Sequence, residues 1–192
     1  MRALLTSLVT AYAAGDAVWI DVDGSGTFNG DIETLAFEHV INVPETVNFS
    51  GTIQDLFRAP SLTGVAEWPS VRIPGETSLY SNSGKLNIHS DFLSAHLQGT
   101  SNMLLDSWPQ APMQIKAFAD LRGVRIDRYA VDVLDGHITG SGKIDYSEGL
   151  QGQLLINGTG IDTTMINAQL PGRLGFDANL LIESMTAFVV DI

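Results

Sequence analysis

A few groups of residues in this chain have types and spacings that could do chemistry, and the first resembles a calcium-binding loop. Asp21, Asp23, Ser25 and Gly26 match positions 1, 3, 5 and 6 of such a loop. The twelfth position, where a bidentate glutamate is needed, is Ile32, and alternating apolar residues precede the loop where a helix should stand. Aspartate and glycine are also the residues that a tight turn requires. We therefore interpret this stretch as a turn rather than as a cation site.

A second group, Gly-Ser-Gly-Lys at residues 140–143, resembles the end of a phosphate-binding loop. The earlier glycine that this motif requires would fall at His137, and the hydroxyl residue that should follow the lysine is Ile144. Both departures remove essential parts of the motif. We therefore interpret residues 140–143 as part of a β-strand with small side chains.

Histidines and paired carboxylates complete the candidates for chemistry. The four histidines are His39, His89, His96 and His137. None of them has the short spacing at which one element presents two metal ligands. Acid pairs such as Asp132 and Asp135 lie beside turns, and no serine stands in a Gly-x-Ser-x-Gly nucleophile elbow. We predict no catalytic residue, metal site or cofactor and expect that the chain is not an enzyme; an enzyme acting on glycans is the alternative.

Composition limits the partners of the chain. A net charge of −12 with only 10 lysines and arginines argues against nucleic-acid binding, which needs clustered cations. The same deficit argues against polybasic attachment to anionic lipid heads, whereas an apolar grip on lipid tails stays open. The 19 glycines follow no collagen period and indicate many turns. The chain has no cysteine, which removes disulfides, thiolate chemistry and cysteine-ligated zinc.

The elements that would position these residues are β-strands with one apolar and one polar face. In residues 173–183 the even positions are apolar and the odd positions, apart from Leu181, are not. Similar alternation recurs along the chain, with turns marked by glycine, proline and aspartate. Strands at intervals of roughly 10–15 residues without crossover helices predict an all-β, antiparallel-rich fold.

Weak repetition narrows an architecture that could otherwise be a sandwich, a barrel or an elongated sheet. A unit of apolar residue, polar residue, glycine and threonine occurs at 49–52, 97–100 and 156–159, and Trp-Pro recurs at 68–69 and 108–109. The uneven spacing argues against a strict solenoid. It favours one hairpin module that is used more than once.

Residues 1–15 differ from this repeated region, residues 16–192. An apolar run that ends at Gly15 predicts a short helix closed by that glycine. A processed secretory signal is the alternative, because Arg2, the apolar run and Ala-Tyr-Ala at 11–13 also fit one. No stretch of the sequence approaches the ~20 apolar residues of a membrane-spanning helix.

Two stretches contain an ordered succession of glycines and alternating apolar residues. The first begins with Gly-Thr-Ile-Gln-Asp-Leu at residue 51 and continues through residues 62–74 and 83–88. The second covers residues 134–146, 154–162 and 170–174. This order resembles the repeating module of the TamB family, the inner-membrane subunits of the bacterial translocation and assembly module within the broader AsmA-like group. The resemblance covers roughly residues 16–183, and the succession is more specific than any single motif.

The resemblance implies a fold, a function and a location. It implies one trough-like domain over residues 16–192, an elongated and curled β-taco-like sheet with an apolar interior. Such a trough carries phospholipid across the periplasm of a Gram-negative bacterium, between inner and outer membranes, and supports outer-membrane biogenesis. The chain departs from a full member because it has neither an N-terminal membrane helix nor a clear segment for an outer-membrane β-barrel partner. We therefore expect an internal piece of the trough, with contact to a barrel through other parts of a longer protein.

On this interpretation the apolar faces of residues 113–121, 138–144, 150–156 and 174–182 line a lipid groove that shields acyl chains without any chemical step. The predicted lining residues are Met113, Ile115, Ile138, Ile144, Leu150, Leu154, Ile156, Leu174, Phe176, Leu180 and Ile182. The alternative is a closed β-sandwich or solenoid, a structural or protein-interaction module in which the same residues pack against each other. A charge placed at Leu154, Phe176 or Leu180 distinguishes the two, because it would unfold a closed core.

Overall fold

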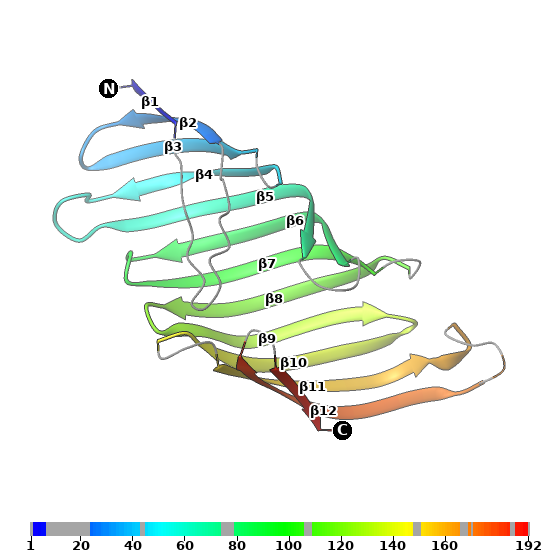
Figure 1. Cartoon of the computed structure of the whole chain (residues 1–192). Helices are drawn as coiled ribbons and strands as arrows, with labels where there is room; N and C mark the ends of the chain where they lie inside the picture. Colours follow the sequence, from blue (N-terminus) through cyan, green and yellow to red (C-terminus); the bar gives the residue numbers. More distant parts are fainter. Residues whose placement is uncertain are drawn as a thin grey trace.

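The sheet topology comes from a computed structural model of the chain (Figure 1). It describes residues 2–6, 24–42, 45–73, 79–105, 109–147, 151–165, 169, 171–184 and 187–191. These residues form β-strands joined by turns and one short 3₁₀ turn, η1 (Thr163–Met165). The strands are β1 (Arg2–Thr6), β2 (Gly24–Gly30), β3 (Thr34–Ile41), β4 (Val47–Gln54), β5 (Ser61–Ile73), β6 (Leu79–Ser90), β7 (Ser94–Leu105), β8 (Ala111–Asp120), β9 (Gly123–Val133), β10 (Gly136–Asp145), β11 (Gln151–Asp162), β12 (Arg173–Ser184) and β13 (Ala187–Asp191).

All the strands belong to one 13-stranded sheet whose spatial order is the order of the sequence, β1 to β13. Every neighbouring pair is antiparallel. Within the described part of the chain, β1 and β13 each pair on one side, so the sheet is open. The predicted all-β, antiparallel fold is confirmed, and these strands form a single layer rather than a sandwich or a closed barrel.

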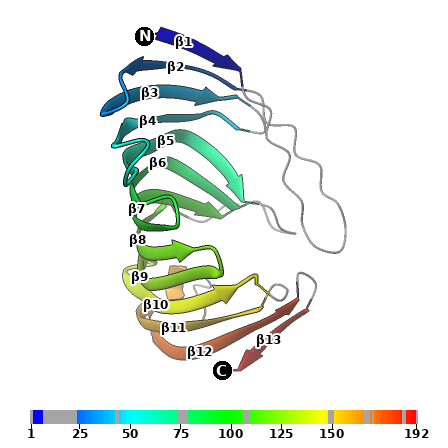
Figure 2. The same cartoon turned by 90° about the vertical axis from the view of Figure 1, so that its left-hand side faces the viewer.

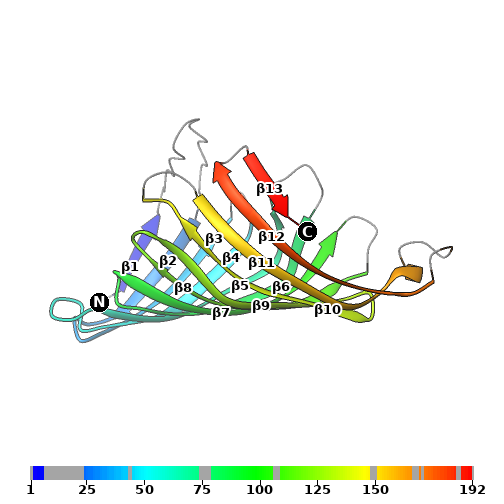
Figure 3. The same ribbon diagram turned by 90° about the horizontal axis from the view of Figure 1, so that it is seen from below.

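The sheet is curled. Figure 2 and Figure 3 show that the strands bend along their length, so that one face is concave and the long side opposite it is open. Register shifts contribute to this curvature, because a bulge bends the strand that contains it. One shift lies in β6 between Asn82 and Lys85, where Ser83 takes a positive φ of 50°. Another lies between Gly158 and Ile161 in β11, where Gly160 has a φ of 67°.

The start of the chain corrects one expectation. In place of the short helix predicted over residues 1–15, Arg2–Thr6 form strand β1 and pair with β2 through partners such as Leu4 and Thr27. An isolated helix of this length is marginal in water, whereas the edge of β2 offers backbone partners. The remainder of residues 1–15, including Gly15, lies outside the described residues. Over the described ranges no helix is long and apolar enough to cross a membrane.

The turns alternate between the two long edges of the sheet. The turns β2–β3, β4–β5, β6–β7, β8–β9 and β10–β11 lie at one edge, on the left in Figure 1, which we call the first edge. The turns β3–β4, β5–β6, β7–β8, β9–β10 and β11–β12 lie at the other, the second edge. The concave floor between the two edges is where the candidate site must be sought.

Candidate functional site: the apolar face of the sheet

Strand register brings the apolar residues onto one face. Residues paired across an antiparallel ladder point their side chains to the same side of the sheet. Leu154 in β11 pairs with Gly142 in β10 on one side and with Leu180 in β12 on the other. In the same way Phe37 in β3 pairs with Phe28 in β2. Continued across the sheet, this pairing produces one face, the apolar face, that runs without interruption from β2 to β12.

The residues predicted to line a groove lie on this face, except Leu150, which is outside the described residues. The register that brings them together runs through Met113–Val131, Ile115–Tyr129, Ile138–Gly158, Ile144–Gly152, Gly142–Leu154, Gly140–Ile156, Ile161–Leu174, Gly158–Phe176, Leu154–Leu180 and Gly152–Ile182. Their contact with lipid stays a prediction. Leu174 is the most exposed of these large side chains, at 45%.

The sequence-based lining missed the other half of the same face. Strands β2 to β7 contribute side chains of the same kind, among them Phe28, Leu35, Phe37, Phe49, Ile53, Leu62, Leu86, Ile88 and Leu97. The signal was available, because residues 35–41 and 86–90 alternate in the same way as the later strands. The floor is therefore about twice as long as predicted.

The opposite face is polar, and neighbouring strands interact across it. Lys85 Nζ lies 2.9 Å from Glu67 Oε1, and Asn157 Nδ2 donates to Asp177 Oδ1 at 2.7 Å. The guanidinium of Arg125 stacks over the ring of Phe118. The Lys85–Glu67 and Asn157–Asp177 pairs are exposed, so each contributes at most about 1 kcal/mol. The polar face is therefore the solvated side of the sheet.

The apolar face is the inner, concave one. Ala117 on the apolar face is only 3% exposed, whereas Ala36 on the polar face is exposed, although both side chains are a single methyl group. Side chains crowd on a concave surface and spread on a convex one, which explains this difference. Most large apolar side chains of the floor are nevertheless half-buried, and none of the large side chains described is below 2% exposure. The floor thus lacks a covering layer among the described strands.

Glycines on this face make room for large side chains from the next strand. A Cβ added at Gly51 would lie 3.0 Å from the Phe37 ring, and one at Gly158 would lie 2.3 Å from the Phe176 ring. At Gly99 the nearest side-chain atom is in Leu86, at 2.9 Å. These are the glycines of the repeated units at 49–52, 156–159 and 97–100. The repeat is therefore a packing device, in which a bare stretch of backbone is covered by a neighbouring side chain.

One polar group is built into the middle of the floor. Trp68 Nε1 donates to Ser81 Oγ at 2.9 Å, and Ser81 Oγ lies 2.5 Å from Ser101 Oγ. Ser101 in turn reaches the backbone oxygen of Asn82. The chain of bonds satisfies both buried hydroxyls and ties β5, β6 and β7 together beside the bulge at Ser83. It stabilises the bend of these strands and leaves none of these three side chains without a partner.

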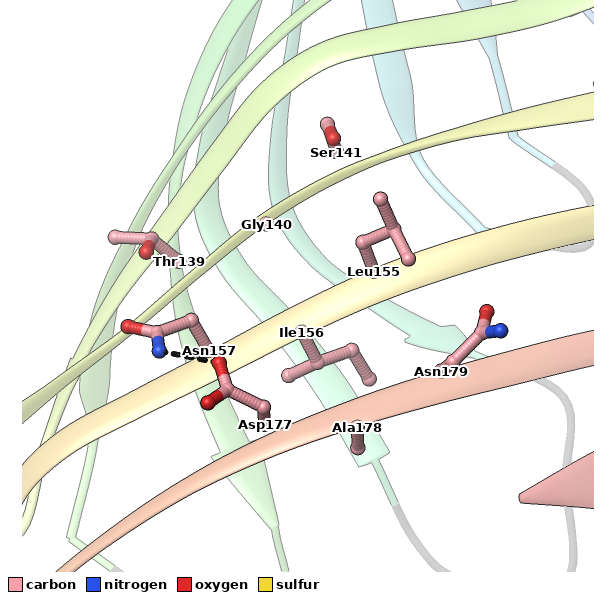
Figure 4. Close-up of a pocket in the computed structure, with 9 residues that line it drawn as sticks. All are labelled: Thr139, Gly140, Ser141, Leu155, Ile156, Asn157, Asp177, Ala178 and Asn179. Carbon is pink, nitrogen blue, oxygen red and sulfur yellow. Dashed lines mark hydrogen bonds between the residues drawn. The ribbon is translucent and has the colours of Figure 1, made fainter. Parts of the chain in front are cut away.

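A shallow depression of about 570 Å³ lies on the polar face of β10, β11 and β12, and Figure 4 shows its lining. Thr139 and Ser141 form one side and Asn157 and Asp177, joined by their hydrogen bond, form the other. Leu155 projects beside them and is 49% exposed. The depression results from small side chains on β10 and is open to solvent. It brings together no acid–base pair and no nucleophile with a base.

The carboxylates whose pKa is lowered hold turns together and take part in no catalytic arrangement. Backbone N–H groups of Thr34 and Glu33 bond to the carboxylate of Asp31 and lower its pKa, and those of Ser94 and Leu93 do the same for Asp91. Burial raises the pKa of Tyr129, a floor residue whose hydroxyl donates to the backbone oxygen of Leu155. Carboxylates that accept backbone N–H bonds are held in their charged form by those bonds.

The residues that resembled chemical motifs lie in strands or outside the described residues. Residues 140–143 lie within β10, as predicted. Ser25 and Gly26 lie within β2, while Asp21 and Asp23 lie outside the described residues. In the ranges that the structure covers, no three histidine, aspartate or glutamate side chains gather as a metal site would need. His89 bonds Thr63, His96 packs on Phe118 and His137 pairs with Asp132.

These features define an extended, single-layered antiparallel sheet whose functional surface is a long apolar floor rather than a pocket. A family model, described as TamB, N-terminal domain, matches residues 24–180, so the chain belongs to the TamB family. It is a family of the bacterial cell envelope, associated with transport and assembly rather than with catalysis. Comparison with curated proteins and with solved structures finds no match.

Proposed function

We propose that the apolar face binds phospholipid acyl chains and shields them from water as they cross the periplasm between the inner and outer membranes. The observation that carries this proposal is a continuous, half-buried apolar floor from β2 to β12 that no other described strand covers. The chain would serve outer-membrane biogenesis as one segment of a lipid path, without any chemical step.

A phospholipid needs shielding from water, and the floor is long enough to provide it. Each CH₂ group removed from water is worth about 0.8 kcal/mol, so a phospholipid with some thirty such groups does not cross water unshielded. Neighbouring strands lie ~4.8 Å apart, so the ten steps from β2 to β12 span about 48 Å. One leaflet of a bilayer core is about 15 Å thick, so an acyl chain is shorter than the floor.

The composition of the floor suits a ligand that slides. Aliphatic side chains such as Leu154 and Ile156 bind an acyl chain by burying its apolar surface. No directional bond has to break when the acyl chain moves. The polar chain Trp68–Ser81–Ser101 on the floor is satisfied internally. Contact with an outer-membrane β-barrel partner remains a proposal drawn from the resemblance, and we assign no residue to it.

Two adjacent leucines of β11 allow a matched test. Leu154 lies on the apolar face, whereas Leu155 lies on the polar face and is 49% exposed. Each is replaced by aspartate, and the two variants are incubated with phosphatidylcholine and examined by native mass spectrometry. We expect Leu154→Asp to lower lipid occupancy at least about tenfold, because a carboxylate beside an acyl chain costs more than 1.4 kcal/mol. Leu155→Asp should bind lipid like the parent protein.

Circular dichroism and urea unfolding of the same variants keep the test interpretable. Both variants should retain the strand spectrum of the parent, because Leu154 faces a half-open floor and not a closed core. Lipid occupancy that is equal in the two variants, or no lipid bound by the parent protein, would contradict the proposal.

A further inference from the structure

Large apolar side chains project from the turns of the first edge. Phe57 in the β4–β5 turn is 78% exposed, and Leu121 in the β8–β9 turn is 73% exposed. We call the exposed apolar residues of these turns the apolar rim: Ile32, Phe57, Phe92, Leu93, Leu121 and Tyr146. Met165, in η1 beside the second edge, is a further exposed apolar side chain, at 50%. Sheet formation alone does not require exposed apolar side chains in turns, so the apolar rim calls for another explanation.

A repeated turn presents the rim. In three turns an aspartate Oδ1 accepts the backbone N–H groups two and three residues further on: Asp31 from Glu33 and Thr34, Asp91 from Leu93 and Ser94, and Asp120 from Arg122 and Gly123. The residue directly after each aspartate is an exposed apolar one: Ile32, Phe92 and Leu121. The turns are therefore ordered platforms that hold apolar side chains in solvent.

Two pairs of neighbouring turns are also joined along the edge. Leu56 N–H donates to the backbone oxygen of Ile32 at 3.1 Å, which links the β4–β5 turn to the β2–β3 turn. Tyr146 N–H donates to the backbone oxygen of Arg122 at 2.9 Å, and the Tyr146 hydroxyl donates to the backbone oxygen of Asp120. These bonds extend the sheet ladder into the turns. They fix the spacing within each of these two pairs of turns, and the pairing of the strands from β5 to β8 sets the spacing between the pairs.

The spacing of the rim matches a helix. Successive turns of one edge are two strands apart, which is about 9.6 Å at ~4.8 Å per strand. A helix that presents an apolar residue every seventh position repeats on one face at about 10.5 Å. An extended strand rises ~3.3 Å per residue and alternates faces, so its same-face repeats of about 6.6 and 13 Å both miss the spacing. A helix lying across the strands can therefore place one apolar residue near each turn.

The charges around the rim select the polar residues of such a helix. Among the described residues in and directly beside these turns, the acidic ones are Asp31, Glu33, Asp55, Asp91, Asp120 and Asp145, and the basic ones are Arg58 and Arg122. This excess of carboxylates repels an anionic bilayer surface and a second copy of the same acidic rim. It attracts lysine and arginine that flank an apolar stripe.

We propose that the apolar rim is a docking site for a basic amphipathic helix that lies along the first edge of the trough, with an apolar residue at every seventh position. The helix would border the open side of the floor without occupying it. The site is therefore separate from the acyl-chain path proposed above, and the two can fail independently.

A synthetic peptide tests the site directly. The probe is a fluorescent helix of about 35 residues, or roughly 52 Å, with a leucine stripe of seven-residue period flanked by lysines. Binding to the whole chain is followed by fluorescence anisotropy at physiological salt. A combined Phe57→Ser, Phe92→Asn and Leu121→Ser variant should weaken binding at least about tenfold, since exposed hot-spot aromatics dominate such contacts. Asparagine is chosen at Phe92 because it tolerates the φ of 68° there.

Two controls make the result decisive. Met165→Ser, on the second edge, should leave the affinity unchanged, and a matched peptide with glutamate in place of lysine should bind at least tenfold more weakly. Equal binding of the parent and the rim variant, or no binding of the lysine peptide to the parent, would overturn the proposal. Lipid occupancy of the rim variant in native mass spectrometry should equal that of the parent, which separates this result from a failure of lipid binding.

Other occupants are outcomes of the same experiment. Flotation with neutral phosphatidylcholine vesicles that depends on the rim would overturn the helix in favour of a bilayer surface. Concentration-dependent dimerisation in sedimentation velocity, abolished by the rim variant, would overturn it in favour of a second copy of the chain.

Discussion

The floor of the trough differs between its first strands, β2 to β4, and its last, β10 to β12. In the first region the rings of Phe37 and Phe49 lie 4.8 Å apart and those of Phe28 and Phe37 lie 6.2 Å apart, and Phe37 is only 6% exposed. In the last region Leu154 and Leu180 pair across β11 and β12 and are half-buried. The first region therefore contains a small aromatic cluster around one nearly buried ring, although Phe28 and Phe49 themselves stay half-buried. The Leu154–Leu180 pair has no such cover, so one floor combines a locally packed cluster at one end with open surface for a ligand.

The largest expected effect contrasts these two regions. Phe37→Ala should lower the free energy of unfolding by about 3 kcal/mol, because it removes a nearly buried ring and leaves a cavity. Leu154→Ala should cost about 1 kcal/mol, because a half-exposed side chain loses less area. Urea unfolding followed by circular dichroism measures both. Equal losses would mean that the two regions are packed alike and would remove the distinction.

A smaller effect tests the bend between the two regions. A Cβ at Gly84 would lie 1.8 Å from the Trp68 ring, so Gly84→Ala should displace the indole and break its bond to Ser81. We expect a loss of about 2 kcal/mol from overpacking and the lost bond. The matched control is Gly172→Ala, where the nearest atom is 3.6 Å away and stability should change little. A Gly84→Ala variant as stable as this control would contradict the role of Trp68.

The smallest effect asks whether a turn of the aromatic region depends on its carboxylate in the same way as a turn further along the sheet. Asp31 serves the aromatic region and Asp91 the middle of the sheet, and backbone N–H bonds lower both pKa values. A depressed pKa in the folded state contributes stability above the unfolded value of about 3.9, and that contribution is lost as pH falls through the folded value. Asp31→Asn and Asp91→Asn should therefore flatten the decline of the urea midpoint between pH 6 and pH 3, by similar amounts.

The measurement for this prediction is a set of urea titrations at several pH values on the parent and both variants. An unchanged slope in either variant would show that its turn does not depend on the charged carboxylate. A change confined to Asp31→Asn would mean that the turn of the aromatic region differs from a turn in the middle of the sheet.

Much of the fold follows from local alternation in the sequence. The period-two pattern at residues 173–183 predicts strand β12 and the face on which Phe176 and Leu180 lie, because side-chain direction in a strand depends on position alone. The curl of the sheet could not be predicted in this way. It depends on bulges such as the one at Ser83, beside which Trp68 of β5 packs over Gly84 and bonds Ser81 of β6, contacts that local alternation does not contain.

One wrong prediction, the N-terminal helix, and one omission, the apolar rim, have other causes. The helix predicted at residues 1–15 followed from local pattern, and the pairing of Arg2–Thr6 with β2 is a long-range contact that local pattern does not contain. The apolar rim was not predicted, because the turns were considered only for the glycine, proline and aspartate that mark them. Its signal is nonetheless in the sequence, since aspartate is followed by an apolar residue at 31–32, 91–92, 120–121 and 145–146.

The strictly sequential strand order has a consequence for how such a molecule forms and grows. Each strand pairs with the strands directly before and after it in the sequence, so contacts are local and their closure entropy is small. Folding can then begin at any hairpin and spread to its neighbours, as in repeat proteins. Insertion or deletion of one hairpin would change the length by about 9.6 Å and leave the other pairings intact. Evolution can therefore lengthen or shorten this sheet in steps of one hairpin.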